Sequence, residues 1–497
     1  MQQPYVMGID IGTGSTKAVA VTRSGTVLAT AQSYYTTLQT DPLFSEQDPE
    51  TIWQAFIETM QSTTSQLKYP PLAVSLSSCM HSLMLVDDTG TPLTANLTWA
   101  DRRSAAIADA LRNTPEGELI YKTTGTPLHA MSPLCKLRWY QQHAHAIFKK
   151  FAKAISIKEY IWHKLFGVYE IDHSIASATG LFDVLKLEWF PTALDFCGVH
   201  ANQLSTPVPT NFLRKGLITS LSGIPAETPF CIGSSDGCLA NVGSDALRLG
   251  TAAVTIGTSG AVRIASPQPI VAFPEMIFNY RLDSETFICG GAVNNGGNVV
   301  QWLLQAFLKG ASDNNYTALF QLAASVPPAS DGLLCLPFLA GERTPLWDEN
   351  ACSAFVGLRS KHGTAHFLRA ALEGVCFALY GVLKKLELAA GRVHTLHVSG
   401  GLVHSPFWMQ LLADVTGKEV CLLQTEDASA VGAAQLYFKT INALEAYPTV
   451  PKTTQKILVP DQNNHALYSS YFPIFQNLYA ALKPSMQQLQ DLKPDLP

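Results

Sequence analysis

A short glycine-, serine- and aspartate-rich segment, GSSDG at 233–237, follows the apolar residues 229–232 of this 497-residue chain. Asp236 would stand at the end of a strand between small residues that leave room for a substrate, where it could act as a general base. The same segment matches GxSxG, in which Ser235 would be the nucleophile of a serine hydrolase. The sequence has no HGGG-type oxyanion segment. A general base, a serine nucleophile and a plain glycine-rich turn all stay open at this point.

The run GTGSTK at 12–17 is a candidate phosphate-binding turn. It does not match the Walker A pattern, because Lys17 follows Thr16, and it does not match GxGxxG, because Lys17 stands in the place of the third glycine. A tight hairpin can still direct backbone N–H groups and hydroxyls toward phosphate oxygens. Asp10, just before the turn, would be placed to supply an oxygen ligand to a phosphate-bound metal ion. A plain β-hairpin is the alternative.

Two later segments have related features. The apolar residues 253–257 end in a second turn of this kind, GTSG at 257–260, and two facing turns are what a nucleotide cleft needs. SGG at 399–401 lies between the apolar residues 393–398 and a helix-like segment at 406–415. Paired glycines there would allow the close backbone approach that an adenosine requires, although a simple strand–helix turn has the same pattern.

The elements that must position these residues follow from the spacing of apolar side chains. Strands are predicted at 5–11, 17–22, 27–31 and 73–77, with a helix that Asp48 caps and that begins at Pro49. A similar order recurs in strands at 253–257, 261–265 and 287–290 and a helix at 296–307. The repeat indicates an internal duplication with a boundary near residue 245. The aromatic segment 468–482 predicts a helix that docks on the body of the protein.

Composition narrows the class of protein. Charged residues make up only 15% of the chain and the net charge is −5, which argues against binding nucleic acid through phosphate neutralisation. We expect neither a membrane span, since no run of about 18 apolar residues occurs, nor a signal peptide. The ten cysteines form no CxxC pair and suit a reducing cytoplasm. His362 and His366 lack the glutamate of HExxH, so no zinc site is predicted.

Longer motifs resemble the FGGY family of carbohydrate kinases along nearly the whole chain. MSPLCKLRWYQQH at 131–143 is similar to the first family signature, with Tyr140 in place of the usual aliphatic residue. SAFVGL at 353–358 and HFLRAALE at 366–373 are similar to the second. The motifs that resemble this family also include GIDIGTGSTK, EQDPETIW, GSSDG, GTSG and SGG.

The resemblance implies an α/β fold of two actin-like (ribonuclease-H-like) domains with an active-site cleft between them. The expected division is an N-terminal domain at 1–245 with the sugar site and first phosphate hairpin, a nucleotide-binding domain at 246–445, and a helical tail at 446–497. By motif match, Asp236 would be the catalytic base and Asp10 would serve a magnesium site. The implied sugar-site residues are Met80, His81, Trp99, Asp101, Met131 and Asp236. The implied nucleotide-binding residues are Thr13, Gly14, Ser15, Lys17, Thr258, Gly297, Gln301, Gly401 and Ser405.

The implied activity is transfer of phosphate from ATP, with Mg²⁺, to the terminal hydroxyl of a sugar acid. Five motifs between residues 80 and 180 are most similar to the members that phosphorylate gluconate: MHSL, WADRRS, GTPLHAMSPL, IKEYIW and SATG. Those members usually have His-Pro-Met where this chain has HAM at 129–131. Members that phosphorylate xylulose share the Met-His pair, so another pentulose or polyol kinase is the alternative, and an actin-like ATPase without a sugar acceptor is a third class. The expected partners are ATP and a small sugar or sugar acid, without nucleic acid or membrane, and the chain could form a homodimer.

Overall fold

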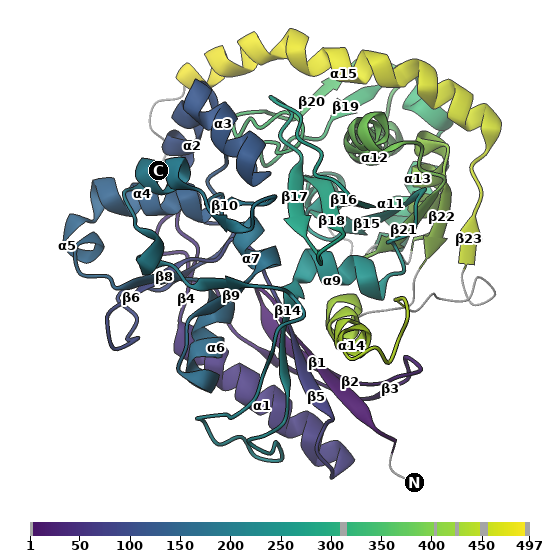
Figure 1. Ribbon diagram of the computed structural model, residues 1–497. Coiled ribbons are helices and arrows are strands. Elements are labelled where there is room, and N and C mark those ends of the chain that lie inside the picture. Colours follow the sequence, from purple (N-terminus) through teal and green to yellow (C-terminus); the bar gives the residue numbers. More distant parts are fainter. Residues whose placement is uncertain (1–2, 309–315, 402–404, 423–426, 448–455, 493–497) are drawn as a thin grey trace. The chain divides into compact units, whose positions relative to one another are not determined.

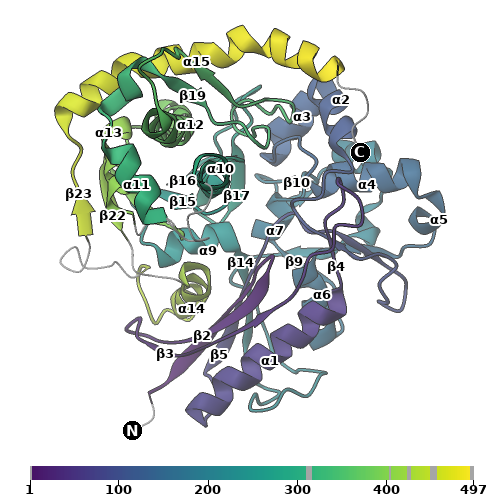
Figure 2. The ribbon, with the colours of Figure 1, turned by 180° about the vertical axis from the view of Figure 1, so that it is seen from behind.

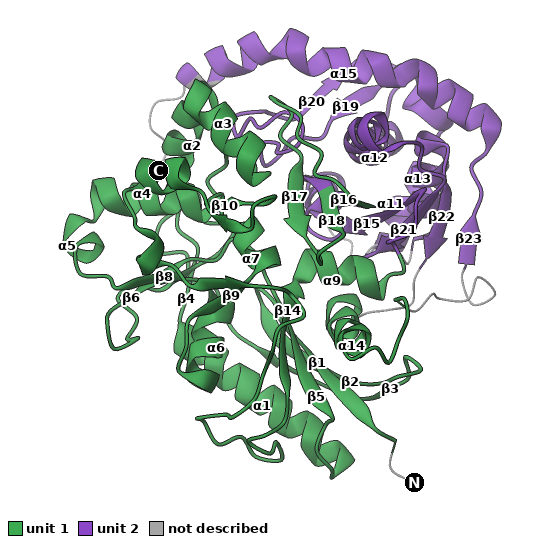
Figure 3. Cartoon of the chain, viewed as in Figure 1, with its two compact units in different colours: residues 1–245, 265–289, 427–449 green, residues 246–264, 290–426, 450–497 purple. Residues whose placement is uncertain are grey.

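The computed structural model describes residues 3–308, 316–401, 405–422, 427–447 and 456–492 (Figures 1 and 2). The chain divides into two compact units, coloured separately in Figure 3. Unit 1 comprises residues 1–245, 265–289 and 427–449, and unit 2 comprises residues 246–264, 290–426 and 450–497. Each unit is described by itself.

Unit 1 contains a six-stranded sheet in the order β13-β14-β5-β1-β2-β3. β1, β5 and β14 run parallel, whereas β2 and β3 form an antiparallel meander on β1. The strands of unit 1 are β1 Tyr5–Ile11, β2 Ser15–Thr22, β3 Val27–Tyr34, β4 Glu46–Gln47, β5 Ala73–Ser78, β6 Met84–Val86, β7 Asn96–Leu97, β8 Lys153–Ile155, β9 Glu170–Asp172, β10 Phe182–Asp183, β11 Glu188–Trp189, β12 Thr206–Val208, β13 Leu213–Arg214, β14 Phe230–Ser235 and β17 Phe278–Arg281.

Several helices of unit 1, among them α1, α3, α4 and α6, begin after a residue whose side chain caps them. The side chain of Asp48 accepts hydrogen bonds from the backbone N–H groups of Glu50 and Thr51, and Pro49 is the first residue of α1, as predicted. The apolar face of α1 joins the core of the sheet. The helices are α1 Pro49–Leu67, α2 Ala105–Arg112, α3 Pro115–Thr124, α4 Pro133–His143, α5 His145–Phe148, α6 Ile157–Phe166, α7 His173–Ser177, α8 Pro191–Cys197, η1 Ala201–Gln203, α9 Asp236–Gly243 and α14 Ala428–Thr440.

Unit 2 repeats the strand pattern of unit 1 in the run β18-β16-β15-β21-β22-β23. β15, β21 and β22 run parallel, β16 is antiparallel to β15 and β23 is antiparallel to β22, so the predicted duplication is confirmed at the level of the sheets. Its strands are β15 Thr251–Ile256, β16 Gly260–Ser266, β18 Phe287–Val293, β19 Leu334–Leu336, β20 Ala354–Val356, β21 Thr395–Ser399, β22 Glu419–Leu422 and β23 Lys456–Leu458; the chain passes between the units within β16 and β18. Its helices are α10 Gly297–Phe307, α11 Tyr316–Ala324, η2 Pro328–Gly332, α12 Thr364–Ala390, α13 Pro406–Thr416 and α15 Gln462–Asp491.

The two long helices of unit 2 have different environments. In the described chain, α12 is long and apolar enough to cross a membrane, but 83% of its most apolar stretch is buried, so its composition follows from its place in the core. The predicted tail helix is α15, the long yellow helix of Figure 1, and it extends further than expected in both directions. Tyr468, Phe472 and Phe475 of α15 contact the ring of Phe377 in α12.

The two compact units are not contiguous along the chain, because they follow packing between distant segments. The division of the sequence into domains at 1–245, 246–445 and 446–497 stays a prediction. The helix α14 belongs to unit 1 because it packs closely on β1. At Gly8 of β1 an added Cβ would lie 1.9 Å from the carbonyl oxygen of Ala430 in α14. The tail helix α15, in turn, is part of unit 2. Such packing between distant segments is not visible in local sequence patterns.

Candidate active site

The parallel strands of unit 1 bring two carboxylates to one edge of the sheet. Asp10 of β1 pairs with Ser77 of β5, and Ser235 at the end of β14 pairs with Ser78. Asp236 is the next residue, so it lies at the same carboxyl edge as Asp10. Burial raises the pKa of the Cys79 thiol, which follows β5, to about 12, and the nearby charges of Asp236 and Asp10 add to that increase.

Asp10 sits among polar groups from three elements. Ser77 Oγ donates to its Oδ1 at 2.7 Å and Ser429 Oγ donates to its Oδ2 at 2.8 Å. Burial raises the pKa of Asp10 above its ordinary value, although the two hydroxyls and the Lys17 ammonium oppose that increase. Lys17 forms an ion pair with Asp427, which precedes α14. An added cation would favour the ionised form of Asp10, as a metal ligand requires.

The first glycine-rich turn is a tight hairpin between β1 and β2, as predicted. The backbone N–H of Gly12 donates to the carbonyl of Ser15 at 3.0 Å, and Gly14 at the tip is exposed. Thr13 is held from two sides: the buried Gln47 amide donates to its carbonyl, and the Trp99 indole N–H donates to its hydroxyl at 3.2 Å. The role of Gln47, in the EQDP motif, was missed from sequence, because an amide next to a helix cap has no distinctive local signal.

His81 has a defined tautomer. It adopts a left-handed backbone conformation with φ of 65° and is only 7% exposed. Its Nδ1 lies 2.8 Å from the carbonyl oxygen of Ala178, so Nδ1 must donate. The Tyr280 hydroxyl, 3.0 Å from Nε2, then donates to that nitrogen in the neutral imidazole. Met80 beside it is half-buried. Sequence reasoning missed Tyr280, which is separated from His81 by 199 residues.

A buried lysine joins the two loops that carry His81 and Trp99. Lys136 of α4 is completely buried and donates to the carbonyl oxygens of His81 and Thr98, each at 2.7 Å. Met131, also buried, lies in the turn just before α4. Lys136 therefore ties together segments that are 55 and 38 residues away in the chain.

Burial lowers the pKa of Lys136 to about 7. Between that value and the ordinary lysine pKa near 10.5, the unfolded chain binds more protons than the folded one, so the free-energy cost of burying this residue diminishes and the protein becomes more stable as the pH rises. We expect the wild type to gain melting temperature relative to Lys136→Met from pH 7 to about 10. Parallel curves for the two proteins in thermal denaturation would contradict a buried, perturbed ammonium.

Asp101 has an environment different from the expected sugar contact. It is completely buried, and the guanidinium of Arg103 donates to both carboxylate oxygens at 2.9 Å. The backbone N–H of Ser45 donates to Oδ2 as well. Arg103 also lies over the ring of Phe44, with its Cζ 3.8 Å from the ring centre. Asp101 therefore orients Arg103 and the loop after Trp99.

Asp236 begins α9 and is half-buried. The backbone N–H of Gly237 donates to its Oδ1 at 2.6 Å. The neighbouring Ser235 is completely buried, and its hydroxyl caps α9 by accepting from the N–H of Cys238. A nucleophile elbow requires an exposed serine hydroxyl at a sharp strand–helix turn. The structure therefore excludes the serine-hydrolase interpretation of GSSDG.

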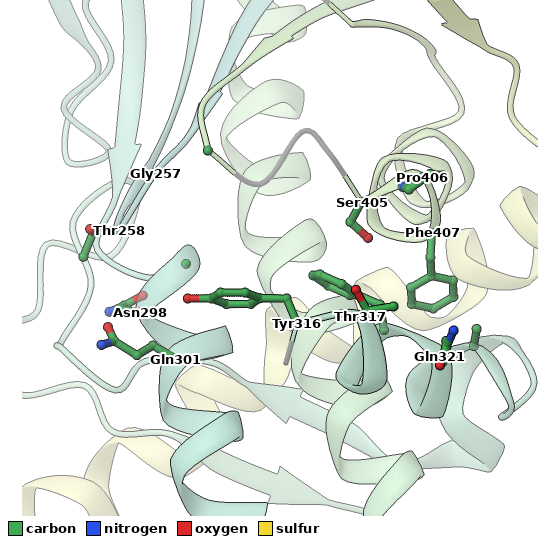
Figure 4. Close-up of a pocket in the computed structure, with 14 residues that line it drawn as sticks. Gly257, Thr258, Asn298, Gln301, Tyr316, Thr317, Gln321, Ser405, Pro406 and Phe407 are labelled. Carbon is green, nitrogen blue, oxygen red and sulfur yellow. The ribbon is translucent and has the colours of Figure 1, made fainter. Parts of the chain in front are cut away.

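Unit 2 contains a cavity of about 750 Å³ at the carboxyl end of β15 and beside the start of α10 (Figure 4). This volume is within the range of small-molecule and cofactor sites. All five residues that the resemblance implies for this half of the nucleotide site line the cavity: Thr258, Gly297, Gln301, Gly401 and Ser405. Residues from three separated segments of the chain thus meet in one place.

Backbone contacts hold the walls of this cavity. The N–H of Gly297 donates to the carbonyl of Gly257 at 2.7 Å, which fastens the second glycine-rich turn to the start of α10. At Gly400 the backbone φ is +115°, and an added Cβ would lie 2.2 Å from the carbonyl oxygen of Ile256. Only glycine fits this approach of β21 to β15, which explains the first glycine after Ser399.

The residues that close the cavity from α11 and from the first turn of α13 were not predicted from the sequence. In Figure 4, the hydroxyl of Tyr316 points toward the side chains of Asn298 and Gln301. The further lining residues not predicted are Thr317, Phe320, Gln321, Ala324, Pro406 and Phe407. Phe320, Ala324, Pro406 and Phe407 resemble ordinary apolar residues, and Thr317 and Gln321 resemble ordinary polar residues of a helix surface, so no local signal distinguishes them.

Comparison with known families agrees with this geometry. Residues 5–243 match the N-terminal domain of the FGGY family of carbohydrate kinases, and residues 252–440 match the C-terminal domain of the same family. The chain belongs to the FGGY family of carbohydrate kinases. It is therefore a two-domain α/β enzyme of the actin-like fold that uses ATP and a sugar substrate, which confirms the fold and enzyme class predicted from sequence.

Individual relatives are similar over the whole chain. A gluconokinase of Bacillus subtilis (strain 168) is 38% identical, and the alignment covers 99% of each chain. The crystal structure of gluconate kinase from Lactobacillus acidophilus has a TM-score of 0.93 at 30% identity and covers 98% of this chain and 99% of its own. The xylulose kinase of the same organism also has a TM-score of 0.93, at 29% identity, with 98% and 100% covered.

Proposed function

We propose that this protein transfers the γ-phosphate of ATP to the terminal hydroxyl of D-gluconate, forming 6-phosphogluconate. The observation that supports this proposal most directly is the position of the Asp236 carboxylate, which lies with Asp10 at one edge of the unit 1 sheet. The chain that contains this pair belongs to a family of carbohydrate kinases. The choice of gluconate is supported by the sequence relatives, among which a gluconokinase is 38% identical and a xylulose kinase 29% identical. The structures of a gluconate kinase and a xylulose kinase are equally similar to this chain and favour neither substrate. Phosphorylation of xylulose or another polyol is the second candidate.

In the proposed reaction, Asp236 accepts the proton of the acceptor hydroxyl as its oxygen attacks phosphorus. The N–H of Gly237 holds one carboxylate oxygen of Asp236, and this contact also fixes the direction in which the other oxygen points. Met80, His81, Trp99 and Met131 are proposed to contact the sugar. Asp101 belongs to this group only through Arg103, because it has no exposed oxygen to offer.

We propose that Thr258, Gly297, Gln301, Gly401 and Ser405 bind the nucleotide in the unit 2 cavity, and that Thr13, Gly14, Ser15 and Lys17 contact the phosphates. The apolar wall formed by Phe320 and Phe407 suits a nucleobase, and the tip of the first hairpin, where Gly14 is exposed, suits phosphate oxygens.

Magnesium would be held by Asp10. Among the described residues no group of three or more His, Cys, Asp or Glu side chains is arranged to hold a metal ion. A single carboxylate completed by phosphate oxygens and water is, however, the usual donor set for Mg²⁺, so Asp10 fits this role. When bound, Mg²⁺ would neutralise charge on the phosphates. Positioning and electrostatic stabilisation carry most of the rate enhancement in phosphoryl transfer.

A panel of acceptors tests the proposed substrate. The purified protein is assayed with MgATP and gluconate, xylulose, ribulose or glycerol by sugar-dependent release of ADP. We expect kcat/KM for gluconate to exceed that for each neutral acceptor by at least about 10²-fold, since polar groups arranged for one substrate are left unpaired by another. A preference for xylulose would select the second candidate, and ADP release that no acceptor stimulates would contradict a sugar kinase.

The remaining predictions concern the surroundings of the enzyme. A cytoplasmic location, the absence of nucleic-acid and membrane partners, and a homodimer stay predictions from the sequence.

A further inference from the structure

A buried ion pair lies directly behind the strand end that carries Asp236. Lys158 of α6 and Asp172 at the end of β9 are 2% and 0% exposed, and Lys158 Nζ lies 2.7 Å from Asp172 Oδ2. Lys158 Nζ also donates to the carbonyl oxygen of Ser234, at 3.1 Å. The ammonium therefore connects a carboxylate to the backbone two residues before the proposed base.

A second connection leads from the same carboxylate to the same strand end. Asp172 Oδ1 caps α7 by accepting from the N–H groups of Ser174 and Ile175, each at 3.0 Å. Ser174 Oγ in turn donates to Ser235 Oγ at 2.9 Å and accepts from the N–H of Ser235 at 3.2 Å. Ser174 and Ser235 are both completely buried. Asp172 thus reaches residues 234 and 235 by two separate routes.

The strand end needs such support because its ladder is interrupted. The pairing of β14 with β5 shifts between Cys231 and Ser234, and Gly233 within this irregularity has a φ of +73°. At a bulge the local ladder hydrogen bonds are disrupted and the strand bends, which can re-aim a side chain near an active site. The side chains from α6 and α7 replace the missing backbone constraints.

We propose that Lys158, Asp172 and Ser174 are positioning residues that hold the backbone of residues 234–235 and thereby aim the Asp236 carboxylate. This inference rests on the proposed function, since it gives Asp236 a task that depends on direction. A buried ion pair is weak evidence for stability, because the desolvation of two charges offsets their attraction. The contribution of this pair to stability therefore does not explain its presence. Its role is instead to hold the bulged strand end next to the reacting group.

The test compares a double variant with a single one. Lys158→Met/Asp172→Asn removes both buried charges, keeps an oxygen to cap α7, and deprives the Ser234 carbonyl of its donor. Ser174→Ala leaves the charges intact and removes the hydroxyl that holds Ser235. The matched control is Arg214→Met/Glu170→Gln, which removes an ion pair that involves the same strand β9 but does not touch residues 234–236.

We expect kcat to fall roughly 10- to 100-fold in both test variants, because a displacement of about 1 Å can cost about 10²-fold in rate. The KM for ATP should change less than about 2-fold, because the proposed nucleotide residues of unit 2 are untouched. The control should keep wild-type kcat. Rates are expressed per ATP-binding equivalent, and melting temperatures are recorded, so that a loss of folded protein is not counted as a loss of rate.

Each result separates the positioning role from the base itself. Wild-type kcat in Ser174→Ala and in the double variant, while Asp236→Asn is strongly impaired, would overturn the positioning role and leave the base in place. An equal fall of kcat in the Arg214→Met/Glu170→Gln control would also overturn it. Near-normal turnover of Asp236→Asn would overturn the assignment of Asp236 as the base, and with it the need to aim this carboxylate, whereas ADP release that no acceptor stimulates would overturn the proposed function. If the double variant does not fold, Ser174→Ala decides alone.

Discussion

Replacing Asp236 with asparagine is expected to lower kcat by roughly 10²- to 10⁴-fold, the usual contribution of a general base. Asparagine has nearly the same shape and can still accept the hydrogen bond from the N–H of Gly237, so the start of α9 should be preserved. It cannot take a proton from the acceptor hydroxyl. Binding of ATP should survive, because the cavity that we assign to the nucleotide lies in unit 2.

The measurement is a steady-state assay with gluconate, together with isothermal titration of ATP. Asp88→Asn, which removes the same charge from an exposed position of unit 1, is the control and should have wild-type activity. A variant at position 236 that turns over within about tenfold of wild type would rule out general-base catalysis by this residue. Loss of ATP binding together with activity would instead indicate a structural role.

The largest loss of stability is expected from Gly233→Ala. An added Cβ would lie 1.6 Å from the carbonyl oxygen of Leu76 in β5, and the backbone φ of +73° is in the left-handed region. The obstacle is backbone of the neighbouring strand, so it cannot move aside as a side chain would. Relief requires β14 to separate from β5 at the edge that carries Asp236. We expect a loss of more than about 4 kcal/mol, which is exceptional for one substitution.

The variant Gly216→Ala separates the steric clash of the added Cβ from the cost of the left-handed backbone conformation. Gly216 has a similar φ of +79° but no atom within 4 Å of the added Cβ. This control should lose only the cost of the left-handed conformation, about 1–2 kcal/mol. Thermal and urea denaturation of the two variants measures the difference. Equal losses would show that the close approach of Gly233 to Leu76 is easily relaxed.

Much of the local structure was predictable because it depends on neighbours in the chain. The strand at 5–11, the hairpins at 12–15 and 257–260, and the cap at Asp48 follow from short-range hydrophobic spacing and turn chemistry. The tail helix was predicted too short, since its additional turns follow from tertiary packing rather than from its aromatic pattern alone. The enzyme class was predicted from the family motifs, which cover nearly the whole chain.

By itself the sequence determined the succession of strands and helix at the start of each half, the family, and the candidate residues Asp10 and Asp236. Only the tertiary structure decided which of those residues have exposed polar groups: it buries Asp101 against Arg103 and turns Ser235 into a helix cap. It also supplied the partners that no motif contains, such as Tyr280 for His81 and Lys158 for the Ser234 carbonyl. The physical reason is that hydrogen bonds and burial act across space, between side chains that the chain brings together from positions tens to hundreds of residues apart.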